Sequence, residues 1–317
     1  MQSWVNRLFR KRDMLVLIVG LAIMQGLACL LINRFMFHPV KGGYDKTLDG
    51  YVDIGTNGVP IAARVIGVPQ RHKVIMYCHG NAEDMTSIDG RFNGLIGKGF
   101  AIATFDYPGY GLSGGSPDEA GCYRSAHRLY DWLVHDRGFA AKDIVVVGYS
   151  IGTGVATELA ASREVGGLWL EAAYLSAPRV VTRVRLLPMD PFPNCERIKD
   201  VKCPIVMLHG TADSIIPYSH GRKLYDLAPK PKWFIPVDGA GHADFIDRMG
   251  RSRYEELLLS FARGGRLDLD REVKVEYEAP WKIDVSQFVN QSVFLWSASF
   301  RTLFSDGSAF NPCTEAT

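Results

Sequence analysis

Short apolar runs rich in β-branched residues alternate with stretches of helical periodicity along most of the chain. The apolar runs predict buried strands, and the periodic stretches predict helices between them. Because strands and helices alternate, we expect an α/β protein with a mainly parallel, doubly wound, eight-stranded sheet. The expected strands cover residues 73–78, 100–106, 144–147, 168–173, 204–208 and 233–237, with two more inside 51–68; the expected helices cover 83–98, 117–136, 152–161 and 254–262.

Residues 51–68 contain a turn signal between two apolar stretches. The dipeptide Asn57-Gly58 favours the left-handed backbone of a tight hairpin turn. The two strands that flank this dipeptide are therefore expected to pair antiparallel.

The longest apolar run lies near the N-terminus. Residues 14–32 are apolar apart from Gln25, which is about the length that a helix needs to span a bilayer. Four basic residues lie between positions 7 and 12, and the positive charge is denser there than beyond the run. This bias favours a cytoplasmic N-terminus. We therefore expect a basic N-terminus and transmembrane signal anchor over 1–34, with the following domain exported to the periplasm or another extracytoplasmic space.

Three other interpretations of this run stay open. A cleaved signal peptide has a shorter apolar region and a small-residue cleavage site, which is not evident here. A lipoprotein signal would end at Cys29, yet residues 30–32 continue the apolar run, and Gly26 is a poor lipobox residue. The third interpretation is a buried core helix.

Composition narrows the function classes. The chain has 317 residues, enough for one large α/β domain with appendages. It carries 36 basic and 34 acidic residues, and this net charge of +2 gives no indication of nucleic-acid binding.

The six cysteines fit an oxidising or a reducing compartment. In an exported domain Cys195 and Cys203 could form a disulfide; the alternative is two unpaired thiols.

The pentapeptide Gly148-Tyr149-Ser150-Ile151-Gly152 is the most informative motif. It follows a predicted buried strand and precedes a predicted helix, and a strand, sharp turn and helix form a nucleophile elbow. The two glycines leave room for the tight turn because they carry no Cβ. Ser150 would then stand at a helix N-terminus, where backbone N–H groups can stabilise an oxyanion. We assign Ser150 as a candidate nucleophile.

A serine nucleophile needs a base, and the base needs an orienting carboxylate. In this type of sheet the chain order is Ser, then Asp or Glu, then His. Asp213 ends a turn after the strand at 204–208, and His242 lies in a glycine-bearing loop after the strand at 233–237. We therefore predict His242 as general base and acid, and Asp213 as its orienting residue. Asp238 and Asp244 flank His242 and compete with Asp213 for the role of orienting it. His209 is interpreted as a loop-shaping residue.

The loop after the strand at 73–78 completes the predicted site. His79-Gly80-Asn81 ends an early strand, which is where the second oxyanion donor arises in this chemistry. We predict the backbone N–H groups of Asn81 and Ile151 as the oxyanion hole. His79, Gly80 and Tyr107 are expected to shape the loops around the site. No cluster of His, Cys or Asp has metal-ligand spacing, so neither a metal nor an organic cofactor is expected.

Six segments together resemble the α/β-hydrolases, specifically the membrane-anchored serine hydrolases related to eukaryotic protein depalmitoylases and their bacterial relatives. The resemblance covers residues 35–263 and implies ester, thioester or amide hydrolysis without a cofactor. Two features depart from that group: the chain continues for about fifty residues past the last core helix, and a predicted transmembrane segment replaces a palmitoylated, cysteine-rich N-terminus. The segments are Phe35-Met36-Phe37-His38-Pro39, His79-Gly80-Asn81-Ala82, the stretch 105–113, the elbow, the stretch 208–213, and Gly239-Ala240-Gly241-His242.

These observations predict a hydrolase domain over 35–263, with a short lid over 174–197 and a C-terminal extension over 264–317. The expected activity is a serine hydrolase that cleaves carboxylic esters or thioesters through an acyl-enzyme. Its expected partners are an acyl substrate and, through residues 14–32, a membrane. A serine peptidase and a non-catalytic binding scaffold on the same fold are the two rival interpretations.

Overall fold

The structure is a computed structural model that describes residues 14–16, 18–20, 34, 36–67, 73–96, 98–182, 190–264 and 267. Within these residues, no helix combines the length and the apolar character needed to cross a bilayer. The predicted anchor at 14–32 and the predicted extension at 264–317 lie largely outside the described residues, so both stay predictions.

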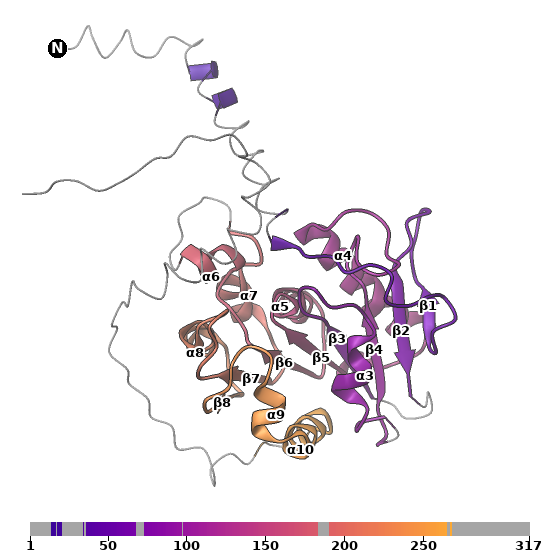
Figure 1. Cartoon of the computed structure of the whole chain (residues 1–317), viewed down its shortest axis with the longest axis vertical. Coiled ribbons are helices and arrows are strands. Elements are labelled where there is room, and N and C mark those ends of the chain that lie inside the picture. The colour runs from indigo at the N-terminus through magenta and orange to yellow at the C-terminus, as the bar shows by residue number, and fades with distance from the viewer. Residues whose placement is uncertain are drawn as a thin grey trace, which may run out of the picture. The chain divides into compact units, whose positions relative to one another are not determined.

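Eight strands form one sheet in the order β1-β2-β4-β3-β5-β6-β7-β8 (Figure 1). β1 pairs antiparallel with β2, and β2 pairs antiparallel with β4, whereas every other pair is parallel. The predicted eight-stranded, mainly parallel sheet is therefore confirmed. The strands are β1 (Tyr51–Asp53), β2 (Ala62–Ile66), β3 (Val74–Cys78), β4 (Ala101–Phe105), β5 (Ile144–Tyr149), β6 (Gly167–Glu171), β7 (Ile205–Gly210) and β8 (Lys232–Val237).

The connection between β1 and β2 contains the predicted tight turn. Asn57 and Gly58 both have positive φ, at 56° and 77°. The Val59 N–H donates to the Thr56 carbonyl at 3.2 Å, which closes the turn. The left-handed pair places the flanking strands antiparallel, as expected.

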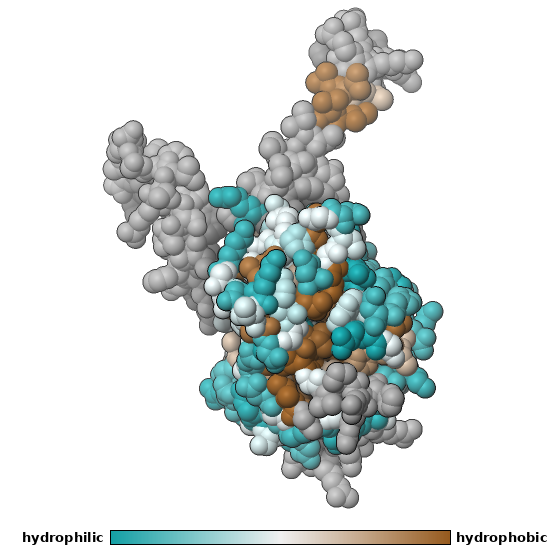
Figure 2. All heavy atoms as spheres, turned by 90° about the vertical axis from the view of Figure 1, so that its right-hand side faces the viewer, coloured by the Kyte–Doolittle hydropathy of each residue, from teal (hydrophilic) through white to brown (hydrophobic). Residues whose placement is uncertain are grey.

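Helices cover both faces of the sheet. Side chains alternate between the two faces along each strand, so each face has its own apolar core. Met76 of β3 joins the core beneath α4 and α5, whereas its neighbour Tyr77 joins the core beneath α3 and α10. The face in Figure 2 is mainly polar, with apolar side chains gathered in a narrow band. The helices are α3 (Ser87–Phe92), α4 (Glu119–Asp131), η1 (Trp132–Asp136), η2 (Ala141–Asp143), α5 (Gly152–Ser162), α6 (Ala177–Thr182), α7 (Asn194–Arg197), η3 (Ile198–Asp200), α8 (Tyr218–Leu227), α9 (Phe245–Met249) and α10 (Arg251–Ala262).

The first crossover helix is shorter than predicted. A helix was expected over 83–98, but α3 covers only Ser87–Phe92. At its start, the Asp84 carboxylate accepts a hydrogen bond from the Thr86 N–H at 2.9 Å, which stabilises a turn instead of a helix. Beyond its end, Gly94 lies against the Glu255 side chain of α10, and a Cβ there would make that carboxylate shift.

The helix predicted over 117–136 divides into two parts. The α-helix α4 begins after Asp118, whose carboxylate caps it by accepting a hydrogen bond from the Gly121 N–H. At Trp132 the helix continues as the π-helical turn η1, where the Arg137 N–H donates to the Trp132 carbonyl at 3.0 Å. The wider turn changes the helical register near its end, which side-chain periodicity alone does not reveal.

The predicted lid segment, 174–197, contains two short helices, α6 and α7. Residues 183–189, between them, lie outside the described residues. Cys195 is buried, Cys203 is half-buried, and both are free thiols. The structure therefore agrees with the unpaired alternative for these two cysteines.

A buried ion pair joins the layer of α3 and α10 to the sheet. The Arg91 guanidinium on α3 pairs with the Glu171 carboxylate at the end of β6, and their side chains are 11% and 0% exposed. The same carboxylate accepts hydrogen bonds from Trp169 Nε1 at 2.9 Å and from the Tyr254 hydroxyl at 2.6 Å. The Arg91 guanidinium also stacks over the Tyr149 ring, 4.6 Å from its centroid. The charge of Glu171 is therefore compensated in a site that excludes water.

We expect the substitution Arg91→Met to lower the free energy of unfolding by about 3–5 kcal/mol, because it leaves the Glu171 charge buried without its partner. The matched control is Arg124→Met, which removes a guanidinium that is 71% exposed and 3.9 Å from Asp118, whose side chain is 48% exposed. An exposed pair of this kind contributes about 1 kcal/mol or less. Urea unfolding followed by circular dichroism measures both values, and equal losses in the two variants would contradict the importance of the buried pair.

Candidate active site

The elbow between β5 and α5 places Ser150 in a strained backbone conformation. Its φ is 52°, in the left-handed region that residues with a side chain rarely adopt. Two contacts require glycine on either side of it: a Cβ at Gly148 would lie 2.6 Å from the Gly152 carbonyl oxygen, and a Cβ at Gly152 would lie 2.1 Å from the Cys78 carbonyl oxygen. The Ser150 N–H donates to the Glu171 carbonyl at 3.0 Å, which stabilises the turn from the neighbouring strand.

The three predicted triad side chains lie together. Ser150 Oγ is 3.0 Å from His242 Nε2, and His242 Nδ1 is 2.8 Å from Asp213 Oδ2. They come from three segments that follow β5, β7 and β8, and the carboxyl ends of parallel strands lie at one edge of the sheet. The chain order Ser, Asp, His therefore matches this spatial arrangement.

Asp213 is held for this contact by its own loop. Its second carboxylate oxygen, Oδ1, accepts hydrogen bonds from the N–H groups of Ile215 and Ile216 at 2.9 and 2.8 Å. The Asp213 side chain is fully buried, and that of His242 is 13% exposed. An ionised carboxylate only accepts hydrogen bonds, so His242 Nδ1 carries the proton and Nε2 is free to accept the Ser150 hydroxyl proton.

The two competing carboxylates make other contacts. Asp238 accepts a hydrogen bond from the Thr211 hydroxyl at 3.2 Å. Asp244 accepts one from the Gly241 N–H at 2.6 Å, and this hydrogen bond holds the pKa of Asp244 below its ordinary value. Both residues thus stabilise the loop around His242, whereas Asp213 is the carboxylate that contacts its ring.

His209 lies beneath the Asp213 loop, as a loop-shaping residue would. Its Nε2 donates to the Ile216 carbonyl at 2.8 Å and is 3.6 Å from Asp213 Oδ2. Burial lowers the pKa of His209, so its ring is neutral near pH 7. It therefore supports the loop without adding a positive charge beside Asp213.

The predicted oxyanion donors lie at the ends of two neighbouring strands. β3 and β5 are parallel with Cys78 opposite Gly148, so the loop that contains Asn81 lies beside the elbow that contains Ile151. Within the described part of the chain, neither of these two backbone N–H groups donates a hydrogen bond. Ile151 also precedes the first turn of α5, where the helix dipole favours negative charge.

The residues predicted to shape the site contact one another. The Tyr107 hydroxyl donates to the His79 carbonyl at 2.8 Å, and their rings pack with centroids 4.1 Å apart. The Gly80 N–H donates to Glu83 Oε2 at 2.8 Å. A Cβ at Gly80 would lie 2.7 Å from the Tyr149 ring, so the loop packs closely on the elbow.

Sequence reasoning missed two residues that support this arrangement. Tyr149 occupies the variable position before Ser150, yet its hydroxyl donates to the His242 carbonyl at 3.2 Å. Asp106 is fully buried behind His79, accepts a hydrogen bond from the Met85 N–H at 2.7 Å, and contacts the Tyr44 hydroxyl. Burial raises the pKa of Asp106. The position of Asp106 directly after a buried strand could have marked it as a candidate. Nothing in the sequence connects Tyr149 to His242.

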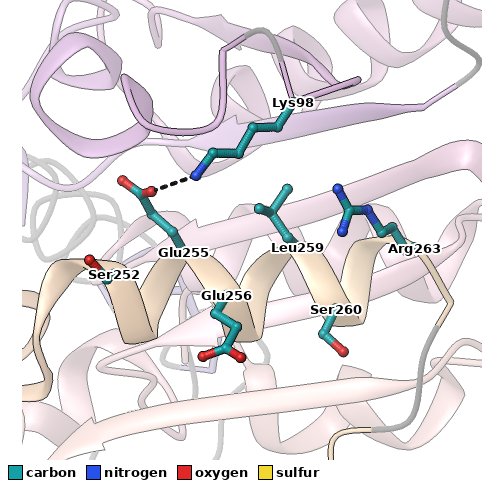
Figure 3. Close-up of a pocket in the computed structure, with 7 residues that line it drawn as sticks. All are labelled: Lys98, Ser252, Glu255, Glu256, Leu259, Ser260 and Arg263. Atoms are coloured by element: carbon teal, nitrogen blue, oxygen red, sulfur yellow. Dashed lines mark hydrogen bonds and ion pairs between the residues drawn. The ribbon is translucent and has the colours of Figure 1, made fainter.

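A separate concavity of about 570 Å³ lies along α10, where Lys98 faces Glu255 (Figure 3). Lys98 precedes β4, whereas Ser150 follows β5, and both strands run parallel to β3. The concavity is therefore at the opposite edge of the sheet from the triad. Among the residues that the structure describes, no group of three or more His, Cys, Asp or Glu side chains is placed to hold a metal ion.

Comparison with known proteins agrees with this architecture. A family model for the alpha/beta hydrolase fold matches residues 73–190. A putative alpha/beta hydrolase of Acanthamoeba polyphaga mimivirus is 31% identical over 235 residues, which cover 72% of this chain and 88% of that protein. The human alpha/beta hydrolase domain-containing protein 17B is 30% identical over 199 residues, which cover 60% and 69%.

A solved esterase from Pyrococcus furiosus aligns with a TM-score of 0.58 at 17% identity, over 72% of this chain and 98% of that one. At this identity the likeness shows a shared fold. Together with the sequence relatives, it establishes that the chain belongs to the α/β-hydrolase family, in which its relatives include alpha/beta hydrolase domain-containing protein 17.

Proposed function

We propose that the protein is a serine hydrolase that cleaves carboxylic ester or thioester bonds through an acyl-enzyme intermediate. The observation that carries the proposal is the continuous hydrogen-bonded series from Asp213 through His242 to Ser150, with distances of 2.8 and 3.0 Å. These distances are within the range needed for proton transfer between a nucleophile and its base.

In the first half of the reaction, Ser150 Oγ attacks the acyl carbon while its proton moves to His242 Nε2. The carbonyl oxygen becomes negative and is stabilised by the N–H groups of Asn81 and Ile151. Asp213 remains ionised and stabilises the positive charge that forms on the imidazole. The tetrahedral intermediate then breaks its bond to the leaving oxygen or sulfur, which receives the proton from Nε2.

In the second half, water attacks the acyl group on Ser150. His242 Nε2 takes a proton from this water, and the N–H pair again stabilises the oxyanion. Collapse of the second intermediate breaks the bond to Ser150 Oγ, which recovers its proton from Nε2. The products are a carboxylic acid and an alcohol or thiol, and the residues return to their starting protonation states.

Two features favour an ester or thioester over a peptide. The segment that connects β6 to α7 is short, and the described part of it forms only the six-residue helix α6. Such a lid leaves the site accessible to small or surface-presented acyl groups. The esterase among the structural neighbours shares the fold and supports the same reaction class.

We expect a fluorophosphonate probe to label the purified full-length chain, and to leave Ser150→Ala unlabelled, because the probe reacts with an activated serine. Ser252→Ala changes an exposed serine on α10 and is the matched control that should label fully. Hydrolysis of p-nitrophenyl esters from acetate to octanoate, beside aminopeptidase substrates, measures turnover. A folded but unlabelled protein would contradict catalysis, and cleavage of the peptidase substrates alone would indicate a peptidase.

We expect Asp213→Asn to lower kcat by about 10⁴-fold, less than Ser150→Ala, because the nucleophile and base remain but the amide no longer fixes the His242 tautomer. Asp238→Asn is the control and should retain kcat within about twofold, since its carboxylate contacts Thr211 instead of His242. Steady-state ester hydrolysis measures both. Full activity in Asp213→Asn would show that another carboxylate orients the base.

A further inference from the structure

The side chain of Asn81 joins the loop after β3 to the segment Met36–His38, which is far away in the sequence. Its Nδ2 donates to the Met36 carbonyl at 2.7 Å and lies 2.9 Å from His38 Nδ1. Its Oδ1 accepts hydrogen bonds from the His38 N–H at 2.8 Å and from the Tyr110 hydroxyl at 2.7 Å. Both ends of the amide are therefore engaged by groups outside its own loop.

The orientation of this amide follows from its partners. A backbone carbonyl only accepts hydrogen bonds and a backbone N–H only donates them, so Nδ2 faces Met36 and Oδ1 faces the His38 N–H. Because Nδ2 donates, His38 Nδ1 is the acceptor, and the imidazole is held as the tautomer with its proton on Nε2. A change of either partner thus leaves a defined donor or acceptor unpaired.

The segment that holds Asn81 is itself anchored. Phe37, between the two residues that contact Asn81, is 4% exposed and belongs to the main core. Its ring packs edge-on against Phe192, with centroids 6.1 Å apart. Met36 and His38 are therefore fixed points against which the Asn81 loop is held.

The loop needs such support because its backbone is strained. Ala82, the next residue, has a φ of 56°, a conformation that costs about 1–3 kcal/mol for a residue other than glycine. The Ala82 N–H donates to Asn81 Oδ1 at 3.2 Å, so the same amide also stabilises this strained residue. Strain of this kind persists only where surrounding contacts determine the conformation.

We propose that the Asn81 side chain and the segment Met36–His38 are positioning elements for the oxyanion hole, holding the Asn81 N–H in place beside the Ile151 N–H. The inference rests on the proposed function. Oxyanion stabilisation needs donors 2.7–3.1 Å from the developing charge, and a displacement of about 1 Å costs roughly 10²-fold in rate. The hydrogen bonds to Met36 and His38 act on kcat through the Asn81 backbone, without contact with substrate.

The test compares Asn81→Ala, Asn81→Asp, His38→Ala and His38→Asn in the full-length chain, with Lys41→Ala as control. Lys41 lies three residues after His38, is exposed, and should retain kcat. We expect Asn81→Ala to lower kcat for a p-nitrophenyl ester by about 10–100-fold with little change in KM. Asn81→Asp removes the amide donor, and His38→Ala removes its acceptor, so kcat should fall several-fold in both variants. His38→Asn restores an acceptor and should recover most of the lost kcat.

Two further readouts separate positioning from a general loss of structure. A trifluoromethyl ketone, which forms an oxyanion on Ser150, should bind more weakly by the same factor by which kcat/KM falls. The apparent pKa in the pH dependence of kcat/KM should stay unchanged, because His242 and Asp213 are not altered. His38→Ala changes only an exposed side chain. If Asn81→Ala does not fold, His38→Ala therefore still allows kcat and ketone affinity to be compared with those of the unaltered protein.

The failure of this inference is distinguishable from that of the proposed function. Unchanged kcat and ketone affinity in the His38 and Asn81 variants, with an active unaltered protein, would overturn the positioning role alone. An unaltered protein with neither ester turnover nor fluorophosphonate labelling would overturn the proposed function and, with it, this inference.

Discussion

The arrangement around Ser150 depends on one steric constraint, the close approach of the N-terminus of α5 to the end of β3. A Cβ at Gly152 would lie 2.1 Å from the Cys78 carbonyl oxygen, a backbone atom that has no freedom to move aside. This approach places Ile151 next to the loop that contains Asn81. The turn before α5 is tight, and Ser150 within it has a φ of 52°. Ser150 and the two predicted oxyanion donors thus lie around one close backbone contact.

Two separate polar systems hold this strained geometry, one on each side of the elbow. On one side, the ion pair of Arg91 and Glu171 fixes the end of β6, whose carbonyl accepts the Ser150 N–H, and supports the Tyr149 ring. On the other side, the Asn81 amide binds the segment Met36–His38. The first system lies outside the predicted lid, whereas the second reaches it, because the Phe37 ring of that segment packs against Phe192. Preorganised groups of this kind need no rearrangement when charge develops.

Local pattern and chain order were sufficient to predict much of this molecule. The strands are short apolar runs, and the sequence Ser150, Asp213, His242 could be placed because each residue follows such a run. The predictions were incomplete where distant contacts are involved. The helix expected over 83–98 covers only Ser87–Phe92, and beyond its end Gly94 lies against Glu255, more than 150 residues away. Tyr149 and Asn81 likewise make contacts with His242 and Met36 that no spacing within their own motifs encodes.

The position of the Asn81 contacts also bears on how a membrane anchor would act, if residues 14–32 form one as their composition predicts. The segment Met36–His38 begins only a few residues after that run and ends at a side chain that holds the predicted oxyanion loop. Met36, which contacts Asn81, directly precedes the buried Phe37, whose ring is fixed in the core. Phe37 therefore anchors the segment between its two contacts with Asn81, so a chain entering from an anchor would meet this fixed point beside the oxyanion loop.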